Sequence, residues 1–311
     1  MAISRASIAK ELLPGLNAVF GLEYGEVNNE LEPLYESENS DRAFEEEVMF
    51  TGFGTAPVKG EGSAVSYDTA QETYVSRYTN ETVALAFAIT EEAMEDNLYD
   101  TFSKLRARGL ARAMANTKQV KGADVFNNGF STAAAWVGGD GVAFISASHP
   151  TVSGVNQSNL MAASDLSEAA LETALTSIQK IKDDRNILIG ASAESLHIPP
   201  DLWATADQIL HSPGTTTAGG TGDGNYAQNS INAVRHMGMV PDGFFVNRRF
   251  TNTNDYFIKT DVPNGAKMFN RVPLQTKMEP DFDTGNLRFK ARERYSFGFS
   301  DWRGYFGSAG S

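Results

Sequence analysis

Histidine and cysteine are the side chains that most often mark catalytic and metal sites, and this chain has few of them. It contains four histidines and no cysteine, which excludes thiolate metal sites, cysteine nucleophiles and disulfide bonds. No two histidines have the spacing of the H-E-x-x-H zinc motif. Isolated histidines more often have structural roles than catalytic ones, and we expect such a role for each. They are His149, His197, His211 and His236.

Three further patterns match known sites only in part. The glycine-rich stretch 214–224 lacks the Gly-Lys-Ser/Thr ending of a P-loop and the flanks of a dinucleotide-binding turn, so a surface loop is expected. Residues 190–194 resemble a G-x-S-x-G elbow, but the last position is Glu194. Asp183 and Asp184 are interpreted as a solvated acidic pair. The sequence therefore predicts no catalytic residue, no cofactor and no metal, and a soluble α+β hydrolase with an unrecognised site remains an alternative.

Basic residues gather in a strand predicted over 287–299, where they alternate with apolar residues. Alternate residues of a strand share one face, so four cations are expected in one row. They could be solvated, pair with acids on a neighbouring strand or arm, or face nucleic acid phosphates. The four are Arg288, Lys290, Arg292 and Arg294.

The acidic residues are unevenly distributed. The net charge is −13 and the sequence pI is near 4.8, which argues against general affinity for nucleic acid. Residues 21–50 hold ten acidic residues and a single base, Arg42. This segment is predicted to be a solvated arm, or an arm that becomes ordered only against a neighbouring subunit. No signal peptide is apparent, and the apolar runs are too short to span a membrane.

The most distinctive predicted element is a helix over 91–130, directly after a strand over 82–89. The strand alternates bulky apolar residues with alanines, and Thr90 is a suitable N-cap. The helix carries acids in its first turns and bases in its later turns, as the helix dipole favours, with a predicted apolar stripe that includes Leu105, Leu110 and Met114. A rod of about 50–60 Å is expected. It indicates an extended subunit.

A long hairpin is predicted over residues 50–82, with a bend at 59–62 and exposed strands around 66–68 and 73–78. Two strands alone are marginally stable, so the hairpin needs a partner surface. Further predictions are helices over 168–182, capped by Ser167, and 201–210, and strands over 195–198, 243–247 and 256–260. A short helix is expected within residues 1–20. Together these elements make an α+β chain.

The order of these elements resembles the major capsid proteins of tailed bacteriophages, which have the Hong Kong 97 fold, with the Mu-like major head subunit as the closest subgroup. The residues that carry the resemblance are 11–20, 82–99, 147–150, 196–203 and 295–302. The resemblance implies an N-terminal arm (1–47), an extended β-hairpin loop (48–86), a peripheral domain with the long spine helix (87–159), an axial α/β domain (160–270) and a return to the peripheral domain (271–311).

The resemblance also implies a function. Copies of such a protein self-assemble as hexamers and pentamers into an icosahedral virion shell around double-stranded DNA, within the host bacterial cytoplasm. Expected partners are the chain itself, a separate scaffolding protein, a portal, optionally a decoration protein, and weakly bound DNA, without a membrane. The candidate inter-subunit or lumenal contacts are Lys59, Glu61, Arg77, Arg288, Lys290, Arg292 and Arg294.

Alternatives to this function remain open at the level of sequence. An encapsulin-like compartment would share the fold but enclose protein cargo, and a tail or baseplate protein would form rings or tubes. Some capsid proteins join subunits through Lys–Asn isopeptide bonds. Lys59 lies near the predicted loop tip, but nothing in the sequence marks an acceptor asparagine, so no cross-link is predicted.

Overall fold

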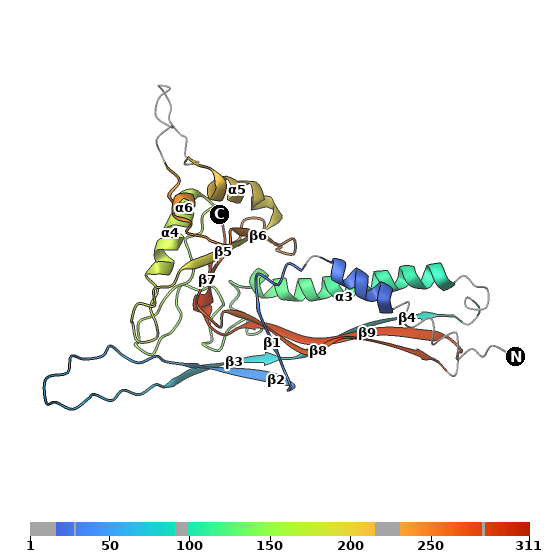
Figure 1. Cartoon of the computed structure of the whole chain (residues 1–311), viewed down its shortest axis with the longest axis horizontal. Coiled ribbons are helices and arrows are strands. Elements are labelled where there is room, and N and C mark those ends of the chain that lie inside the picture. The colour runs from blue at the N-terminus through green and yellow to red at the C-terminus, as the bar shows by residue number, and fades with distance from the viewer. Residues whose placement is uncertain (1–16, 28, 91, 93–98, 215–230, 282–283) are drawn as a thin grey trace, which may run out of the picture.

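The computed structural model describes residues 17–27, 29–90, 92, 99–214, 231–281 and 284–311. Its strands form two four-stranded sheets and one two-stranded hairpin. Figure 1 shows three parts: a long flat layer, a compact part above one end of that layer, and a hairpin that extends away from both. We call them the helix–sheet layer, the compact part and the extended hairpin.

The helix–sheet layer is a four-stranded sheet with α3 (Tyr99–Asn127) along one face. Its strand order is β1-β8-β9-β4, in which β1 is parallel to β8 and the other neighbours are antiparallel. The 29 residues of α3 span about 44 Å at 1.5 Å per residue, so the long helix is confirmed. The strands are β1 (Glu36–Asn39), β4 (Glu81–Ile89), β8 (Ala266–Pro280) and β9 (Leu287–Phe299).

The buried stripe of α3 is narrower than the sequence predicts. Ala107, Leu110, Ala111 and Met114 are buried at helical spacing against β9, and the small alanines let the helix approach the sheet closely. Leu105, predicted on this stripe, lies off it and is 64% exposed. Residues 91 and 93–98, where the helix was predicted to start, lie outside the described residues.

The compact part is the second sheet, in the order β10-β7-β5-β6, with α4, α5 and α6 packed on it. Ser167 caps α4 by accepting a hydrogen bond from the Ala170 N–H, as predicted. One hydrophobic core joins these helices to the sheet. The elements are α4 (Glu168–Gln179), β5 (Ala193–Ile198), the 3-10 turn η1 (Pro200–Leu202), α5 (Trp203–His211), α6 (Ala233–Met237), β6 (Phe244–Val246), β7 (Tyr256–Thr260), the 3-10 turn η2 (Trp302–Gly304) and β10 (Tyr305–Ser308).

An aromatic cluster joins the helix–sheet layer to the compact part. Phe126, near the end of α3, is fully buried and packs edge-on against Phe257 of β7 and Tyr305 of β10, at ring distances of 5.3 and 5.0 Å. Tyr35 reaches it from the N-terminal side at 5.8 Å. Aromatic pairs of this geometry stabilise beyond the area they bury, so this contact fixes the two parts against each other.

The acidic segment differs from the sequence prediction. Residues 17–26 form a helix whose Phe20 is buried against α3 and β9. Leu31, Leu34 and Tyr35 are buried at the junction, so this part of the arm is ordered on its own subunit rather than only on a neighbour. The apolar residues gave the segment enough surface to bury within one chain. Residues 1–16, where a short helix was predicted, lie outside the described residues.

The two strands of the extended hairpin pair only in the part nearest the rest of the subunit, not along the whole predicted length. Its strands are β2 (Phe44–Phe50) and β3 (Glu72–Thr79), which are antiparallel. Residues 51–71 form a long loop without strand pairing, so the strand predicted around 66–68 was wrong. Glycine and proline interrupt this stretch, and both disfavour a regular ladder.

The C-terminal region departs from the sequence prediction at two strands. β8 was not predicted, because Pro273 interrupts its alternation at a position where the β8–β9 register shifts. The sequence predicted that residues 271–311 return to the peripheral domain, but the end of the chain leaves the helix–sheet layer. Instead β10 pairs with β7 in the second sheet, and Trp302 and Phe306 are buried in the core of the compact part.

Candidate functional site

His149 has a structural role, as predicted. Its buried ring lies with Nδ1 2.6 Å from Asp140 Oδ2 and Nε2 3.0 Å from Asn159 Oδ1. The ring stacks on Trp302 with centroids 4.2 Å apart. Asn159 in turn donates to three backbone carbonyls, so the network ties a loop to the C-terminal segment and presents no open face to a substrate.

His197 is also part of the core. Its ring is buried, with Nε2 2.9 Å from Ser195 Oγ, and burial lowers its pKa to about 3. The ring is therefore neutral and satisfied by a local hydroxyl. His211 and His236 are exposed, and His211 lies 2.8 Å from Asp207. Within the described part of the chain, no group of three His, Cys, Asp or Glu residues could hold a metal ion. The glycine-rich loop 215–224 lies outside that part.

Asp184 is not the solvated residue that the sequence suggested. It is buried and lies 2.9 Å from the buried Arg303, which also lies 3.3 Å from Asp301. The Arg303 guanidinium is 4.5 Å from the Trp302 ring centre. Buried charges need this kind of pairing, and burial raises the pKa of Asp301. Arg303 is thus an internal support and adds nothing to the basic surface.

The four alternating cations of β9 share one face, as predicted. Residues at 287, 289, 291 and 293 are buried, whereas Arg288, Lys290 and Arg292 are exposed on the opposite face. Phe289 and Ala291 lie in the core shared with α3. Arg294 is half-buried, and its Nε has no hydrogen-bond partner among the described residues. Pairing with an acid is seen for Arg288, whose partner Asp281 directly follows β8.

Small residues flank this row of cations. Across the ladder to β4, Arg292, Lys290 and Arg288 stand opposite alanines 84, 86 and 88. On the β8 side, Lys290 stands opposite Lys277, and Arg288 stands opposite Glu279. Arg288 pairs with Asp281, and Lys277 pairs with Glu279. The result is a sheet surface of small residues from which cationic side chains protrude. We call this surface, formed around Arg288, Lys290 and Arg292, the basic face.

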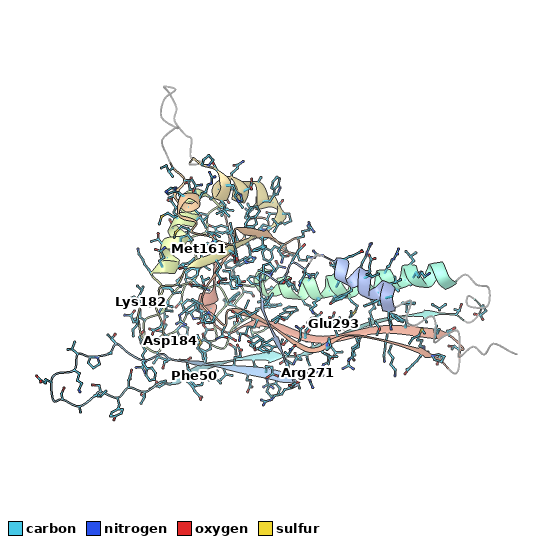
Figure 2. All side chains as sticks on the ribbon, viewed as in Figure 1. Phe50, Met161, Lys182, Asp184, Arg271 and Glu293 are labelled. Atoms are coloured by element: carbon cyan, nitrogen blue, oxygen red, sulfur yellow. The ribbon has the colours of Figure 1, made fainter. Side chains whose placement is uncertain are left out.

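The extended hairpin carries a second exposed surface, made of apolar side chains. Phe50, Phe53, Val58 and Tyr67 are 60%, 67%, 100% and 98% exposed. Exposed apolar side chains gathered on one protrusion are typical of an interaction site. Figure 2 shows the side chains of this loop extending outward from the ribbon, away from the rest of the chain.

The predicted contacts Lys59, Glu61 and Arg77 all lie on the extended hairpin. Lys59 and Glu61 are exposed beside a turn in which the Ser63 N–H donates to the Gly60 carbonyl. Arg77 on β3 lies 3.8 Å from Glu46, and its guanidinium is 3.8 Å from the Phe44 ring centre. The loop between β2 and β3 and the start of β9 lie at opposite ends of the molecule (Figure 1), so one subunit does not bring Lys59 and Glu61 near the basic face.

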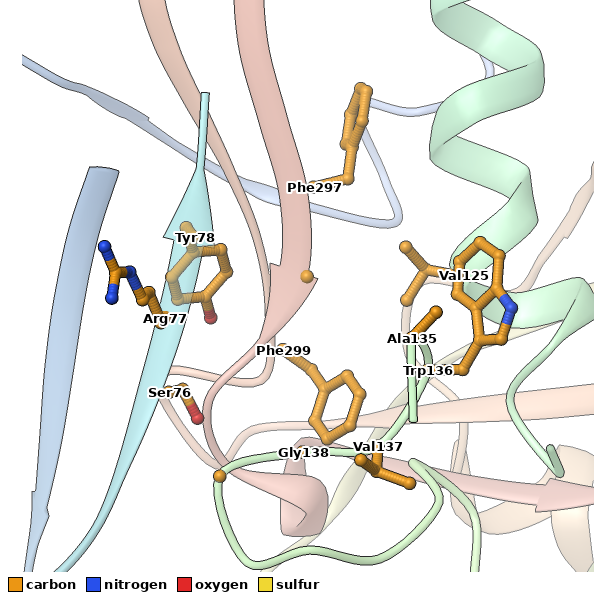
Figure 3. Close-up of a pocket in the computed structure, with 12 residues that line it drawn as sticks. Ser76, Arg77, Tyr78, Val125, Ala135, Trp136, Val137, Gly138, Phe297 and Phe299 are labelled. Atoms are coloured by element: carbon orange, nitrogen blue, oxygen red, sulfur yellow. The ribbon is translucent and has the colours of Figure 1, made fainter. Parts of the chain in front are cut away.

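A pocket near the base of the hairpin is too small for a typical ligand. It has a volume of about 140 Å³ between β3 and the loop 135–139, below the range of about 300–1,000 Å³ that is usual for ligand sites. Figure 3 shows Tyr78, Phe299 and Trp136 around it. No helix in the described part of the chain is long and apolar enough to cross a membrane.

Comparisons with known proteins agree on the kind of molecule that this fold resembles. A family model described as "Phage capsid protein" matches residues 73–306. No curated protein matches the chain in sequence.

Several solved structures share the fold. A virus-like particle from Pyrococcus furiosus is 11% identical, with coverage of 95% of this chain and 98% of that chain and a TM-score of 0.53. A structure from Mycobacterium phage Adephagia is 11% identical, with coverage of 91% and 90% and a TM-score of 0.51. The capsid of a native GTA particle is 13% identical, covers 90% of each chain and has a TM-score of 0.52.

Proposed function

The chain belongs to the phage capsid protein family, and from this premise we propose that its copies assemble as hexamers and pentamers into an icosahedral shell around double-stranded DNA. As a capsid protein it is a structural subunit of a virion shell, and this family membership indicates a non-enzymatic role. Assembly in the host bacterial cytoplasm is part of the proposal. The resemblance to the Mu-like subgroup stays a prediction.

The observation that carries the assembly proposal is the extended hairpin. Its loop exposes Phe53, Val58 and Tyr67, and the two-stranded ribbon behind them has little stability alone. A neighbouring copy that covers this loop would bury the apolar side chains and restrain the ribbon. Full burial of Phe53 or of Val58 would contribute about 1.5–3 kcal/mol each. On this basis the hairpin corresponds to the extended loop of the family, the helix–sheet layer to the peripheral domain and the compact part to the axial domain.

The basic face is the second element of the proposal. Lys290 and Arg292 lie on a low surface beside alanines 84 and 86, where an acidic segment of a neighbouring subunit or the phosphates of packaged DNA could approach. The chain carries a net charge of −13, so contact with DNA would be local and weak. Arg292→Glu is expected to lower the yield of DNA-filled heads, whereas Lys180→Glu on the exposed end of α4 should not. A normal yield from Arg292→Glu would contradict this role.

The assembly proposal is tested by electron microscopy of the chain co-expressed with a candidate scaffolding protein. Closed isometric shells, or hexameric and pentameric capsomers, are the expected result. A stable monomer in the presence of a confirmed scaffold would contradict it. The contents of the shells separate the two container functions, because packaged DNA fits a virion and an enclosed enzyme fits an encapsulin-like compartment. A scaffolding protein, a portal and a decoration protein are proposed as further partners.

Covalent linkage between subunits is not part of the proposal. Denatured particles analysed by intact mass should give a single species near 33.7 kDa, the mass of one chain. Species at multiples of this mass would show that cross-links form, and would direct attention to Lys59 at the exposed end of the hairpin.

A further inference from the structure

The extended hairpin is held at its base by a buried polar network. Tyr78 Oη on β3 lies 2.5 Å from Ser300 Oγ, and Ser300 donates to Glu47 on β2. Lys267 on β8 is buried and lies 2.5 Å from Glu47 and 2.9 Å from Glu38. Both strands of the hairpin are therefore anchored to the helix–sheet layer at one place, which we call the root.

The hairpin packs closely against its neighbours at the root. A Cβ atom added at Gly139 would come within 2.7 Å of the Val75 carbonyl carbon, and one added at Gly298 would come within 2.8 Å of the Tyr78 ring. Any change in the direction of the hairpin must therefore occur beyond the root.

A second contact holds the hairpin further out, and it comes from the compact part. Arg185 Nη1 lies 2.9 Å and 2.8 Å from the two carboxylate oxygens of Asp68, and its Nη2 donates to the Thr69 carbonyl. Asp68 also accepts a hydrogen bond of 2.6 Å from the Gly54 N–H on the opposite limb of the loop. One carboxylate therefore ties both limbs of the hairpin to Arg185. We call this contact the clasp.

The turn that presents Arg185 is itself well ordered. Asp183 Oδ1 accepts hydrogen bonds from the N–H groups of Arg185 and Ile187, at 2.9 and 2.7 Å. The neighbouring loop supports the same turn, because the Ser153 N–H donates to the Asp184 carbonyl at 3.0 Å. Arg185 is therefore aimed at the hairpin by the body of the subunit.

Between the root and the clasp the hairpin spans a hollow. The hollow has a volume of about 380 Å³ and lies between residues 72–74 of the hairpin and the loops around Asp140 and Thr151. In Figure 2 Asp184 lies directly above Phe50, where the loop leaves β2. A ribbon held at two points with a gap between them has a defined direction, whereas a ribbon held at the root alone does not.

We propose that Arg185 and Asp68 are positioning residues for assembly: their clasp sets the direction of the hairpin in the free subunit, so that a second copy meets it already aligned. This inference rests on the proposed function, in which the hairpin contacts a neighbouring copy. Holding a loop in its bound direction before association reduces the ordering cost of binding.

The ion pair of the clasp is partly exposed, so it forms at neutral pH but is weakened by salt. The side chains of Arg185 and Asp68 are 22% and 43% exposed, so solvent and salt reach them. The Gly54 N–H, followed by Arg185, lowers the pKa of Asp68 to about 2. The carboxylate is therefore ionised throughout the neutral range, and the clasp is lost only as the pH falls through about 2.

The direction of the hairpin can be measured on the unassembled subunit. Because the chain has no cysteine, Lys59→Cys near the loop tip and Glu172→Cys on α4 would be the only labelling sites. Double electron–electron resonance between spin labels at these sites reports the distribution of distances. We expect a narrow distribution with the clasp intact and a distribution at least twice as broad in Asp68→Asn. Glu46→Gln is the matched control, because its partner Arg77 lies within the hairpin.

Removal of the cation identifies the interaction responsible. Arg185→Ala leaves the hydrogen bond from the Gly54 N–H to Asp68 in place and should broaden the distribution as much as Asp68→Asn does. If it stays narrow, Arg185 does not direct the hairpin and the clasp proposal is overturned. An unchanged distribution in Asp68→Asn also overturns it.

Assembly followed by light scattering with the scaffolding protein tests the consequence. Asp68→Asn should assemble several-fold more slowly than Glu46→Gln. Broad distances with an unchanged rate would overturn the positioning role. Failure of every variant, including the native chain, to assemble would instead contradict the proposed function, and the spin-label distances would still decide whether the clasp directs the hairpin.

Discussion

Two glycines of α3 provide a matched test of how the N-terminal segment packs. Gly109 is exposed, and a Cβ atom added there would meet nothing within 4 Å. Gly122 is buried, and a Cβ atom added there would lie 2.7 Å from Leu31 Cδ1 and still closer to Cδ2. Leu31 is only 3% exposed, and the Tyr35 hydroxyl donates to the Gly122 carbonyl at 2.6 Å. The N-terminal segment thus lies directly on this glycine.

The expected magnitudes follow from two opposing effects. Alanine favours a helix interior over glycine by about 0.8–1 kcal/mol, so Gly109→Ala should raise the free energy of unfolding by that amount. Gly122→Ala gains the same helix propensity but crowds Leu31, and overpacking in a core costs about 1–3 kcal/mol. The difference between the two variants removes the propensity effect, and we expect it to be about 1–3 kcal/mol, with Gly122→Ala the less stable.

Urea unfolding of the unassembled subunit measures both variants, and Leu31→Ala completes a double-mutant cycle. Leu31→Ala alone should cost about 2–5 kcal/mol. In that background the crowding is gone, so Gly122→Ala should become as stabilising as Gly109→Ala, which is a non-additive result. If Gly122→Ala stabilises the native chain as much as Gly109→Ala does, Leu31 does not pack there, and the conclusion that this segment is ordered on its own subunit is refuted.

Three further predictions concern the interior. Phe126→Ala removes the ring that joins the two parts and should cost about 3–5 kcal/mol, whereas Tyr67→Ala on the exposed loop should change thermal stability by less than about 0.5 kcal/mol. The folded-state pKa of His197, about 3, lies below its ordinary value of 6.5. The contribution of the neutral ring to stability is therefore complete above about pH 6.5 and is lost as the pH falls toward 3. The urea midpoints of unfolding at high and low pH should differ less in His197→Gln than in the native chain. Arg303→Ala leaves two carboxylates buried without their cation and should cost about 3–5 kcal/mol in denaturant unfolding, and a cost as small as that of Arg77→Ala, whose ion pair is exposed, would contradict this account.

The elements that the sequence predicted well are those with strong local patterns. The alternation in β4 and β9 gave their ranges to within one residue, and Ser167 marked the start of α4. The basic face followed from the same period-two argument, because it depends only on which strand residues point the same way. Local periodicity and capping were sufficient for these features.

The elements that the sequence missed depend on contacts between distant residues. β1 pairs with β8 across more than 200 positions of the chain, and the helix at 17–26 is stabilised by Phe20 in a core shared with β9. Asp68 and Arg185 show the same limit at the candidate site. Nothing near either residue marks a partner, since only the tertiary fold brings the loop 183–187 against the hairpin.

The pairing of β9 and β10 also has a consequence for protein synthesis. β9 lies between β8 and β4 in the first sheet, and β10 completes the second. A nascent chain that has emerged only as far as β8 therefore has β4 without a partner in the first sheet and one edge of β7 unpaired in the second. Unpaired strand edges make partly folded chains prone to aggregate. The first sheet is complete only after β9 has been synthesised, and the second only after β10. Translation itself thus delays completion of the fold, because the joining strands are made after most of the strands that they join.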